Sequence, residues 1–164
     1  MSRLRSSKPV VLGLGNPLFR DEGLGIHVIW QLMAGDWGKR AQLVDGGTGG
    51  LALLGIVEEA RYLIVVDAID GGYPPGTVKR LYGKEIDFLR CAQLSVHQVG
   101  FQEVLALARI RSRYPENMVL IGVQPQNLEW GTQLSYEVNL RIPKVIAMIY
   151  QQVEAWAETS VDAD

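Results

Sequence analysis

The sequence predicts a three-layer α/β fold, in which a mainly parallel sheet has helices on both faces. Apolar, β-branched runs that end in Gly, Asp or Pro occur at residues 8–15, 41–47, 61–69 and 117–125, and such runs are typical of buried strands. Segments with helical periodicity separate them, an alternation that is typical of parallel sheets. At 164 residues the chain has the size of a single domain. We expect one domain over residues 1–164, with an ordered core over about 8–157.

The remaining elements follow in chain order. A helix from Glu22 to Met33 has an apolar or small face that comprises Gly25, Val28, Ile29, Leu32 and Met33. A second, short helical pattern covers residues 51–59. The mixed run at 77–82 follows the turn DGGYPPG, so we expect an edge strand there. Long helices are expected at 96–112 and 135–157.

Composition excludes several classes of function. A formal net charge of -2 and a pI near 5.7 provide no broad basic surface, so we expect no nucleic acid partner. Cys91 is the single cysteine, which excludes an intrachain disulfide and favours a reducing, cytoplasmic location. The N-terminal region lacks the form of a signal peptide. The apolar runs are far shorter than the roughly 20 residues of a membrane helix, so no membrane insertion is expected.

Acidic residues gather where the predicted strands end. Glu22 follows the first strand, Asp45 ends the second and Asp67 lies near the end of the third. Ligands of parallel sheets bind beyond the carboxyl ends of the strands. His97 lies in the sequence SVHQ, a capping box with Ser95 as N-cap. The first turn of a helix disfavours imidazolium, so His97 is suited to donate a lone pair to a metal.

Other residues of these motifs favour structural interpretations. The first glycine loop has Leu18 where a dinucleotide fingerprint needs its third glycine. Two carboxylates in the loop would also repel a phosphate. We interpret Asp21 as a helix N-cap and Cys91 as a structural thiol. His27 lies about 140° from Glu22 on the expected helix, and we interpret it as a packing or surface residue.

Glu22, Asp67 and His97 together offer two oxygens and one nitrogen, enough to hold a divalent metal with open coordination positions. This set does not decide between zinc, nickel, iron and manganese. Neither HExxH nor GxSxG occurs, which favours metal-assisted hydrolysis over zincin or serine chemistry. The segment DGGTGG (45–50) is either a flexible turn or a surface that a substrate backbone approaches closely.

Five motifs in a fixed order resemble the nickel-iron hydrogenase maturation endopeptidases over about residues 9–150: GLGNPLFRDEGLG, DGGTGG, LIVVDAID, SVHQVG and LIGVQP. The resemblance implies a twisted five-stranded sheet and assigns metal contact to Glu22, Asp67 and His97. It also associates the glycine-rich segment with substrate and catalysis. Asp45 is then a candidate for proton transfer, and the substrate contacts are expected at Gly46, Gly47, Thr48 and Gly49.

The same resemblance implies a function. Members of this family remove a C-terminal extension from the precursor of the hydrogenase large subunit once nickel has been inserted, so nickel is expected to arrive with the substrate and no nucleotide is expected. Three alternatives remain open: a non-enzymatic chaperone of the large subunit, a nucleotide-binding Rossmann-like protein, and a metallopeptidase that carries its own metal.

Overall fold

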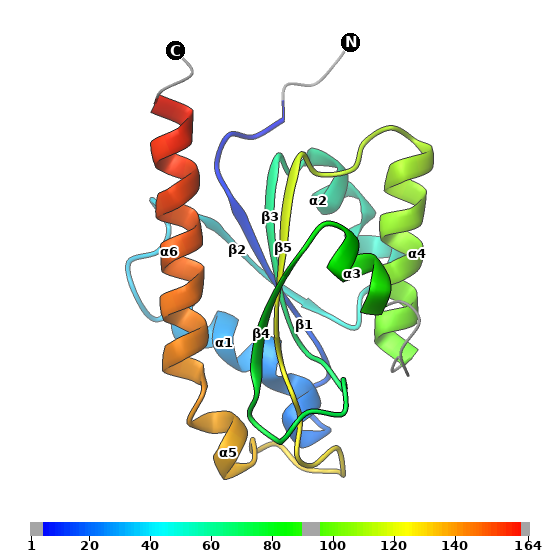
Figure 1. The fold of residues 1–164 in the computed structure, drawn as a ribbon, viewed down its shortest axis with the longest axis vertical. Helices are drawn as coiled ribbons and strands as arrows, with labels where there is room; N and C mark the ends of the chain where they lie inside the picture. The colour runs from blue at the N-terminus through cyan, green and yellow to red at the C-terminus, as the bar shows by residue number, and fades with distance from the viewer. Residues whose placement is uncertain (1–4, 90–95, 162–164) are drawn as a thin grey trace.

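The computed structural model describes residues 5–89 and 96–161 (Figure 1). Within these ranges a single five-stranded sheet has the order β2-β1-β3-β5-β4. In chain order its strands are β1 (Val10–Leu14), β2 (Gln42–Gly47), β3 (Tyr62–Ala68), β4 (Val78–Tyr82) and β5 (Asn117–Val123). β1 pairs in parallel with β2 and β3, and β3 pairs in parallel with β5. The mainly parallel five-stranded sheet predicted from the sequence is therefore confirmed.

The two edges of the sheet differ. β4 pairs antiparallel with β5, which confirms the predicted edge strand at 77–82. β2 forms the other edge, and its side chains are exposed or half-buried except for Gly46. The prediction of a buried strand at 41–47 was wrong, because an edge strand has a neighbour on one side only.

Helices cover both faces of the sheet (Figure 1). A 3₁₀ helix, η1 (Arg20–Gly23), leads into α1 (Leu24–Met33). η2 (Gly50–Leu53) similarly leads into α2 (Leu54–Glu59). The others are α3 (Lys84–Leu89), α4 (Val96–Ile110), α5 (Tyr136–Asn139) and α6 (Ile142–Val161). In the described residues no helix is both long enough and apolar enough to cross a bilayer.

The sheet divides the hydrophobic core into two clusters. Val11, Ile64 and Val66 pack with α1 and α6 on one face, whereas Leu12 and Val65 pack with α2 and α4 on the other. Burial of each such side chain stabilises the fold by about 1.5–3 kcal/mol. Successive side chains of β1 and β3 belong to the two clusters in turn. A side chain in these strands therefore points to the face opposite to that of the residues directly before and after it.

Three expectations about the helices need correction. α1 begins at Leu24, so Glu22 lies before it in η1. Met33 is exposed rather than part of the buried face, since it is the last residue of the helix. The helix expected at 135–157 is divided into α5 and α6. Pro143 lies in the first turn of α6, where its missing N–H costs nothing, but it cannot continue a preceding helix.

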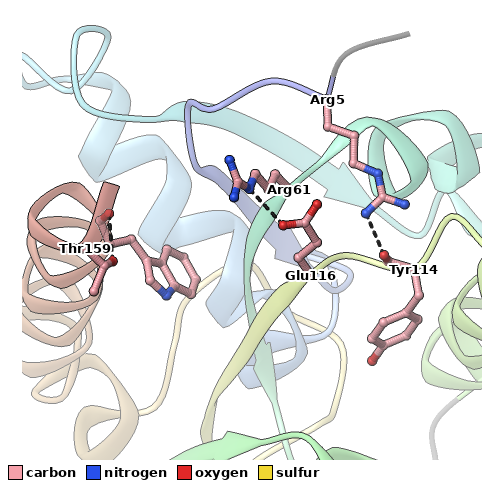
Figure 2. Close-up of polar contacts among 6 residues, drawn as sticks. Arg5, Arg61, Tyr114, Glu116 and Thr159 are labelled. Atoms are coloured by element: carbon pink, nitrogen blue, oxygen red, sulfur yellow. Dashed lines mark hydrogen bonds and ion pairs between the residues drawn. The ribbon is translucent and has the colours of Figure 1, made fainter. Parts of the chain in front are cut away.

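Polar contacts join the elements at the amino edge of the sheet (Figure 2). Arg61 Nε, just before β3, lies 2.8 Å from Glu116 Oε2, just before β5. Arg5 donates a hydrogen bond of 2.8 Å to the carbonyl of Tyr114, and the Thr159 hydroxyl donates to the Trp156 carbonyl near the end of α6. The hydrogen bond with Glu116 raises the pKa of Arg61. The contacts of Arg61 and Arg5 hold the end of the sheet that lies away from the predicted site.

Candidate functional site at the carboxyl edge of the sheet

The carboxyl ends of the parallel strands lie at one edge of the sheet, where the predicted site residues were expected. Glu22 is half-buried in η1, which directly follows β1 and its loop and is in contact with β3. Asp67 is the penultimate residue of β3. Figure 1 shows that α4 begins at this same end of the sheet. Three segments that are distant in the sequence therefore lie at the same end of the sheet.

Glycines allow η1 and α1 to pack directly on the sheet. A Cβ at Gly25 would overlap the carbonyl oxygens of Val66 and Leu14, and a Cβ at Gly13 would overlap the carbonyl oxygen of Gly25. Gly15 has a φ of 127°, and a Cβ there would overlap the carbonyl oxygen of Glu22. The glycine loop thus brings the backbone that carries Glu22 against the ends of β1 and β3.

Asp67 is a buried carboxylate on the α4 side of the sheet. Its side chain is 3% exposed. Its neighbours Val66 and Ala68 both pack in the cluster with α1 and α6, so the side chain of Asp67 points to the opposite face, which α2 and α4 cover. A carboxylate at this depth needs hydrogen bonds, positive charge or a metal in contact to offset the cost of its desolvation.

Asp45 lies at the predicted edge, but its side chain lies on the other face from Asp67. Its Oδ2 accepts a hydrogen bond of 3.1 Å from the indole Nε1 of Trp30 on α1. Leu43, two residues earlier, packs against the cluster with α1 and α6. The carboxylate of Asp45 is exposed. Trp30 could not be predicted as a partner of Asp45, because nothing in the spacing of the two residues along the sequence indicates their contact.

The glycine-rich segment connects β2 with η2. A Cβ at Gly46 would lie 2.6 Å from the side chain of Leu12, so this residue packs closely on β1. Gly47 has a φ of 49°, in the left-handed region that favours glycine. Thr48 and Gly49 are exposed. Their side of the turn is open to solvent next to η2, which packs against α4.

His97 is the second residue of α4, so its place in the first turn of a helix agrees with the prediction. Its side chain lies outside the described residues, as do Ser95 of the predicted capping box and Cys91. Among the described side chains no three His, Cys, Asp or Glu residues form a metal-binding group. The predicted ligand set includes His97, and it stays a prediction.

Asp21 is a structural anchor and not the predicted helix cap. Its side chain is completely buried. Oδ2 accepts hydrogen bonds from the backbone N–H groups of Gln126 and Asn127 and from the Ser135 hydroxyl, each at 2.8 Å. Oδ1 accepts from the Ser135 N–H at 2.7 Å. The N-cap interpretation was wrong because the loop that follows β5 supplies these donors, and no local pattern indicates that it lies nearby.

His27 packs inside this edge, as expected for a structural residue. Its ring lies 5.3 Å from that of Trp30, edge to face. Burial lowers the pKa of His27, and a hydrogen bond with the backbone of Thr132 opposes that shift. The helical angle between Glu22 and His27 has no meaning in the structure, because Glu22 precedes α1.

Comparison with known proteins relates the chain to hydrogenase maturation. A family model described as HycI, hydrogenase maturation protease, matches residues 26–152. The Hydrogenase 2 maturation protease of Escherichia coli K12 is 32% identical over 159 residues, which cover 94% of this chain and 93% of that protein. The solved structure of the hydrogenase maturating endopeptidase HybD from E. coli has a TM-score of 0.78 and 32% identity, covering 87% of this chain and 89% of that chain.

A longer relative matches as well. The hydrogenase expression/formation protein HupD of Thiocapsa roseopersicina is 45% identical over 143 residues, which are 85% of this chain. They are 64% of the HupD protein. This chain therefore spans less than two thirds of the length of that relative.

Proposed function

Because this chain belongs to the hydrogenase maturation protease family, we propose that it is an endopeptidase that removes the C-terminal extension of a nickel-iron hydrogenase large-subunit precursor. The observation that carries the proposal is that Glu22, Asp67 and the first turn of α4 all lie at the carboxyl end of the sheet. The close packing at Gly15 and Gly25 supports it, since it holds Glu22 beside the strand ends. We place the reaction in the cytoplasm, because a chain with a single cysteine forms no intrachain disulfide and so suits a reducing compartment.

We assign recognition of nickel to Glu22, Asp67 and His97. Two carboxylates and one imidazole suit a borderline divalent cation and leave positions for the ligands that hold nickel in the substrate. A metal held there polarises a scissile carbonyl or lowers the pKa of an attacking water. We propose that the three side chains of this protein hold the cation beside the C-terminal tail of the precursor. A precursor without nickel should bind less tightly, because Glu22, Asp67 and His97 then have no cation to contact.

The glycine-rich segment is our candidate for binding the tail of the precursor. Gly47 carries no side chain and a Cβ there would meet only the Asp45 carboxylate, at 3.8 Å, so an extended peptide can approach its backbone closely. Gly46 is buried against Leu12, and we propose that it shapes the turn that presents Gly47. Thr48 and Gly49 are exposed beside η2, which packs on α4. For Asp45 we propose a positioning role through Trp30 rather than proton transfer, because its side chain points away from the face that carries Asp67.

The packing of the first glycine loop argues against the nucleotide alternative. Phosphate cradles present free backbone N–H groups to their ligand. Here the space beside Gly13 and Gly15 is filled by the carbonyl oxygens of Gly25 and Glu22. We therefore expect no saturable binding of NAD or ATP, which a titration followed by calorimetry tests.

Mass spectrometry of a large-subunit precursor incubated with the protein tests the function. We expect loss of a discrete C-terminal peptide from nickel-loaded precursor and none from the nickel-free form. Cleavage of both forms would retain the peptidase and remove the nickel requirement. Binding without cleavage would favour the chaperone. Metal analysis of the purified protein addresses the third alternative, since a metallopeptidase with its own metal contains that metal before it meets substrate.

Variants then test the residue assignments. Glu22→Gln and His97→Ala should each slow cleavage at least about 100-fold with an unchanged thermal unfolding midpoint. Glu158→Gln, an exposed change on α6, is the matched control. Asp45→Asn should retain most activity, because the amide oxygen still accepts the hydrogen bond from Trp30. Asp45→Leu should lose most activity, because leucine has no acceptor for that hydrogen bond. If Asp45→Asn slowed cleavage as much as Glu22→Gln does, the result would contradict the positioning role and favour proton transfer by Asp45.

A further inference from the structure

A cavity of about 230 Å³ lies next to Asp67 on the same face of the sheet. Gly122, which lines it, pairs with Asp67 across β3 and β5. Ile69, which also lines it, follows Asp67 by two residues. The lining of the cavity therefore begins two residues along the chain from the proposed nickel-recognising carboxylate, and one strand away from it across the sheet.

The sheet register places a cation on the far side of this cavity. Asp67, Gly122 and Lys79 occupy one row across β3, β5 and β4. Paired residues of neighbouring strands point to the same face. Leu81, two residues after Lys79, packs with the cluster under α2 and α4, which confirms the face. The cavity thus lies between an acidic residue that contributes to the proposed site and a lysine.

The shape of the cavity depends on two residues of β5 and its end. Gly122 leaves room for Ile69, because a Cβ at Gly122 would overlap the Ile69 side chain. Gln124 is 7% exposed, and its Oε1 accepts hydrogen bonds from the N–H groups of Gly71 at 2.8 Å and Tyr73 at 3.1 Å. These bonds hold the loop that contributes Tyr73 to the cavity wall.

The chemistry of the walls indicates the kind of group that binds there. Ile69, Leu81 and the Tyr73 ring are apolar, and Lys79 Nζ lies 4.5 Å from the centroid of that ring. Glu85 also lines the cavity, and its Oε2 accepts the Tyr82 N–H at 3.0 Å. The volume is below the roughly 300–1,000 Å³ of typical small-molecule sites. One amino-acid side chain suits this space better than a cofactor.

We propose that this cavity is a specificity subsite of the proposed endopeptidase, an inference that rests on the proposed function. It binds an uncharged aliphatic side chain of the precursor at a residue close to the scissile bond. The apolar walls favour such a side chain. Lys79 disfavours a basic one by like-charge repulsion in a partly desolvated wall, and the Glu85 carboxylate that also lines the cavity already accepts the Tyr82 N–H.

Precursors with single substitutions test this assignment. Once mass spectrometry has located the cut, each of the two residues on either side is changed to Leu or to Lys, and kcat/KM is measured with the nickel-loaded precursor. At one position we expect the wild-type protein to cleave the Lys form at least about 10-fold more slowly than the Leu form. Lys79→Glu should reduce this ratio at least about 10-fold, and Lys79→Met should reduce it in part.

Lys39→Glu is the matched control, since it makes the same charge change at an exposed residue between α1 and β2. It should leave the ratio as in the wild type. Thermal unfolding midpoints confirm that each variant is folded, as expected for half-exposed Lys79 on an edge strand. If neither Lys79→Glu nor Lys79→Met changed the ratio of kcat/KM between the Leu and Lys precursors, the result would overturn the subsite but not the proposed function. Absence of cleavage by the wild-type protein would overturn the proposed function and the subsite with it.

Discussion

Two adjacent acids, Asp21 and Glu22, show how differently neighbouring residues are used at this edge. Asp21 is buried and accepts hydrogen bonds from the loop after β5 and the start of α5. Glu22 is half-buried at the strand ends, on backbone that packs against Gly15. Because Asp21 holds η1 against a second loop, it positions the residue beside it. We therefore assign the stability of this turn to Asp21 and its chemistry to Glu22.

Replacement of Asp21 by Asn should destabilise the protein by about 3 kcal/mol. The amide has one acceptor oxygen in place of two, so at least one of the buried N–H groups that the carboxylate now accepts loses its partner. Urea unfolding measures this change. Asp36→Asn, at an exposed position after α1, should change the free energy of unfolding by less than about 0.5 kcal/mol. Equal effects in the two variants would contradict the anchor role.

His27 should make stability depend on pH in the mildly acidic range. Burial lowers its pKa below the ordinary value of 6.5, so the unfolded state takes up the proton first. The stability contributed by the neutral ring is complete above that value and is lost as the pH falls through the lower pKa of the folded state.

Urea unfolding at pH 7.5 and at pH 5.5 tests this expectation. The midpoint should fall less between the two conditions in His27→Gln than in the wild-type protein, because glutamine does not titrate. An identical fall in both proteins would show that His27 is not responsible.

At the scale of elements, the contact between α1 and the sheet depends on glycine. Gly13 and Gly25 let the first turn of α1 reach the backbone of β1 and β3, so the helix axis starts directly beside the strand ends. The same approach brings η1, which carries Glu22, into contact with β3, which carries Asp67. A helix with larger residues at these positions would be held away from the sheet, and η1 would move away from the end of β3.

Gly25→Ala should therefore destabilise the protein by about 3 kcal/mol and slow precursor cleavage. A Cβ there meets backbone atoms of Leu14 and Val66, which cannot move as a flexible side chain can. Gly55→Ala in α2 is the control, since a Cβ at Gly55 would meet no described atom within 4 Å. Alanine at Gly55 should be neutral or stabilise by up to about 1 kcal/mol. Thermal and urea unfolding of both variants measure the contrast.

At the scale of the whole molecule, the parallel sheet collects residues from distant parts of the chain. The carboxyl ends of β1, β2 and β3 bring Glu22, Asp45 and Asp67 to one edge, and α4 begins at that edge as well (Figure 1). The antiparallel β4 then adds Lys79 to the row that contains Asp67. The polar contacts drawn in Figure 2 lie at the amino edge of the sheet, opposite the carboxyl edge that carries the proposed site.

The sequence by itself determined the α/β class, the five strands, the edge position of residues 77–82 and the edge of the sheet at which acids gather. These features follow from local periodicity and from the rule that parallel strands end together. The tertiary structure alone decided that Asp21 is an anchor, that Asp45 binds Trp30 on the face opposite Asp67, and that Lys79 lies in the row with Asp67. Each depends on contacts between segments far apart in the chain, which spacing along the sequence does not encode.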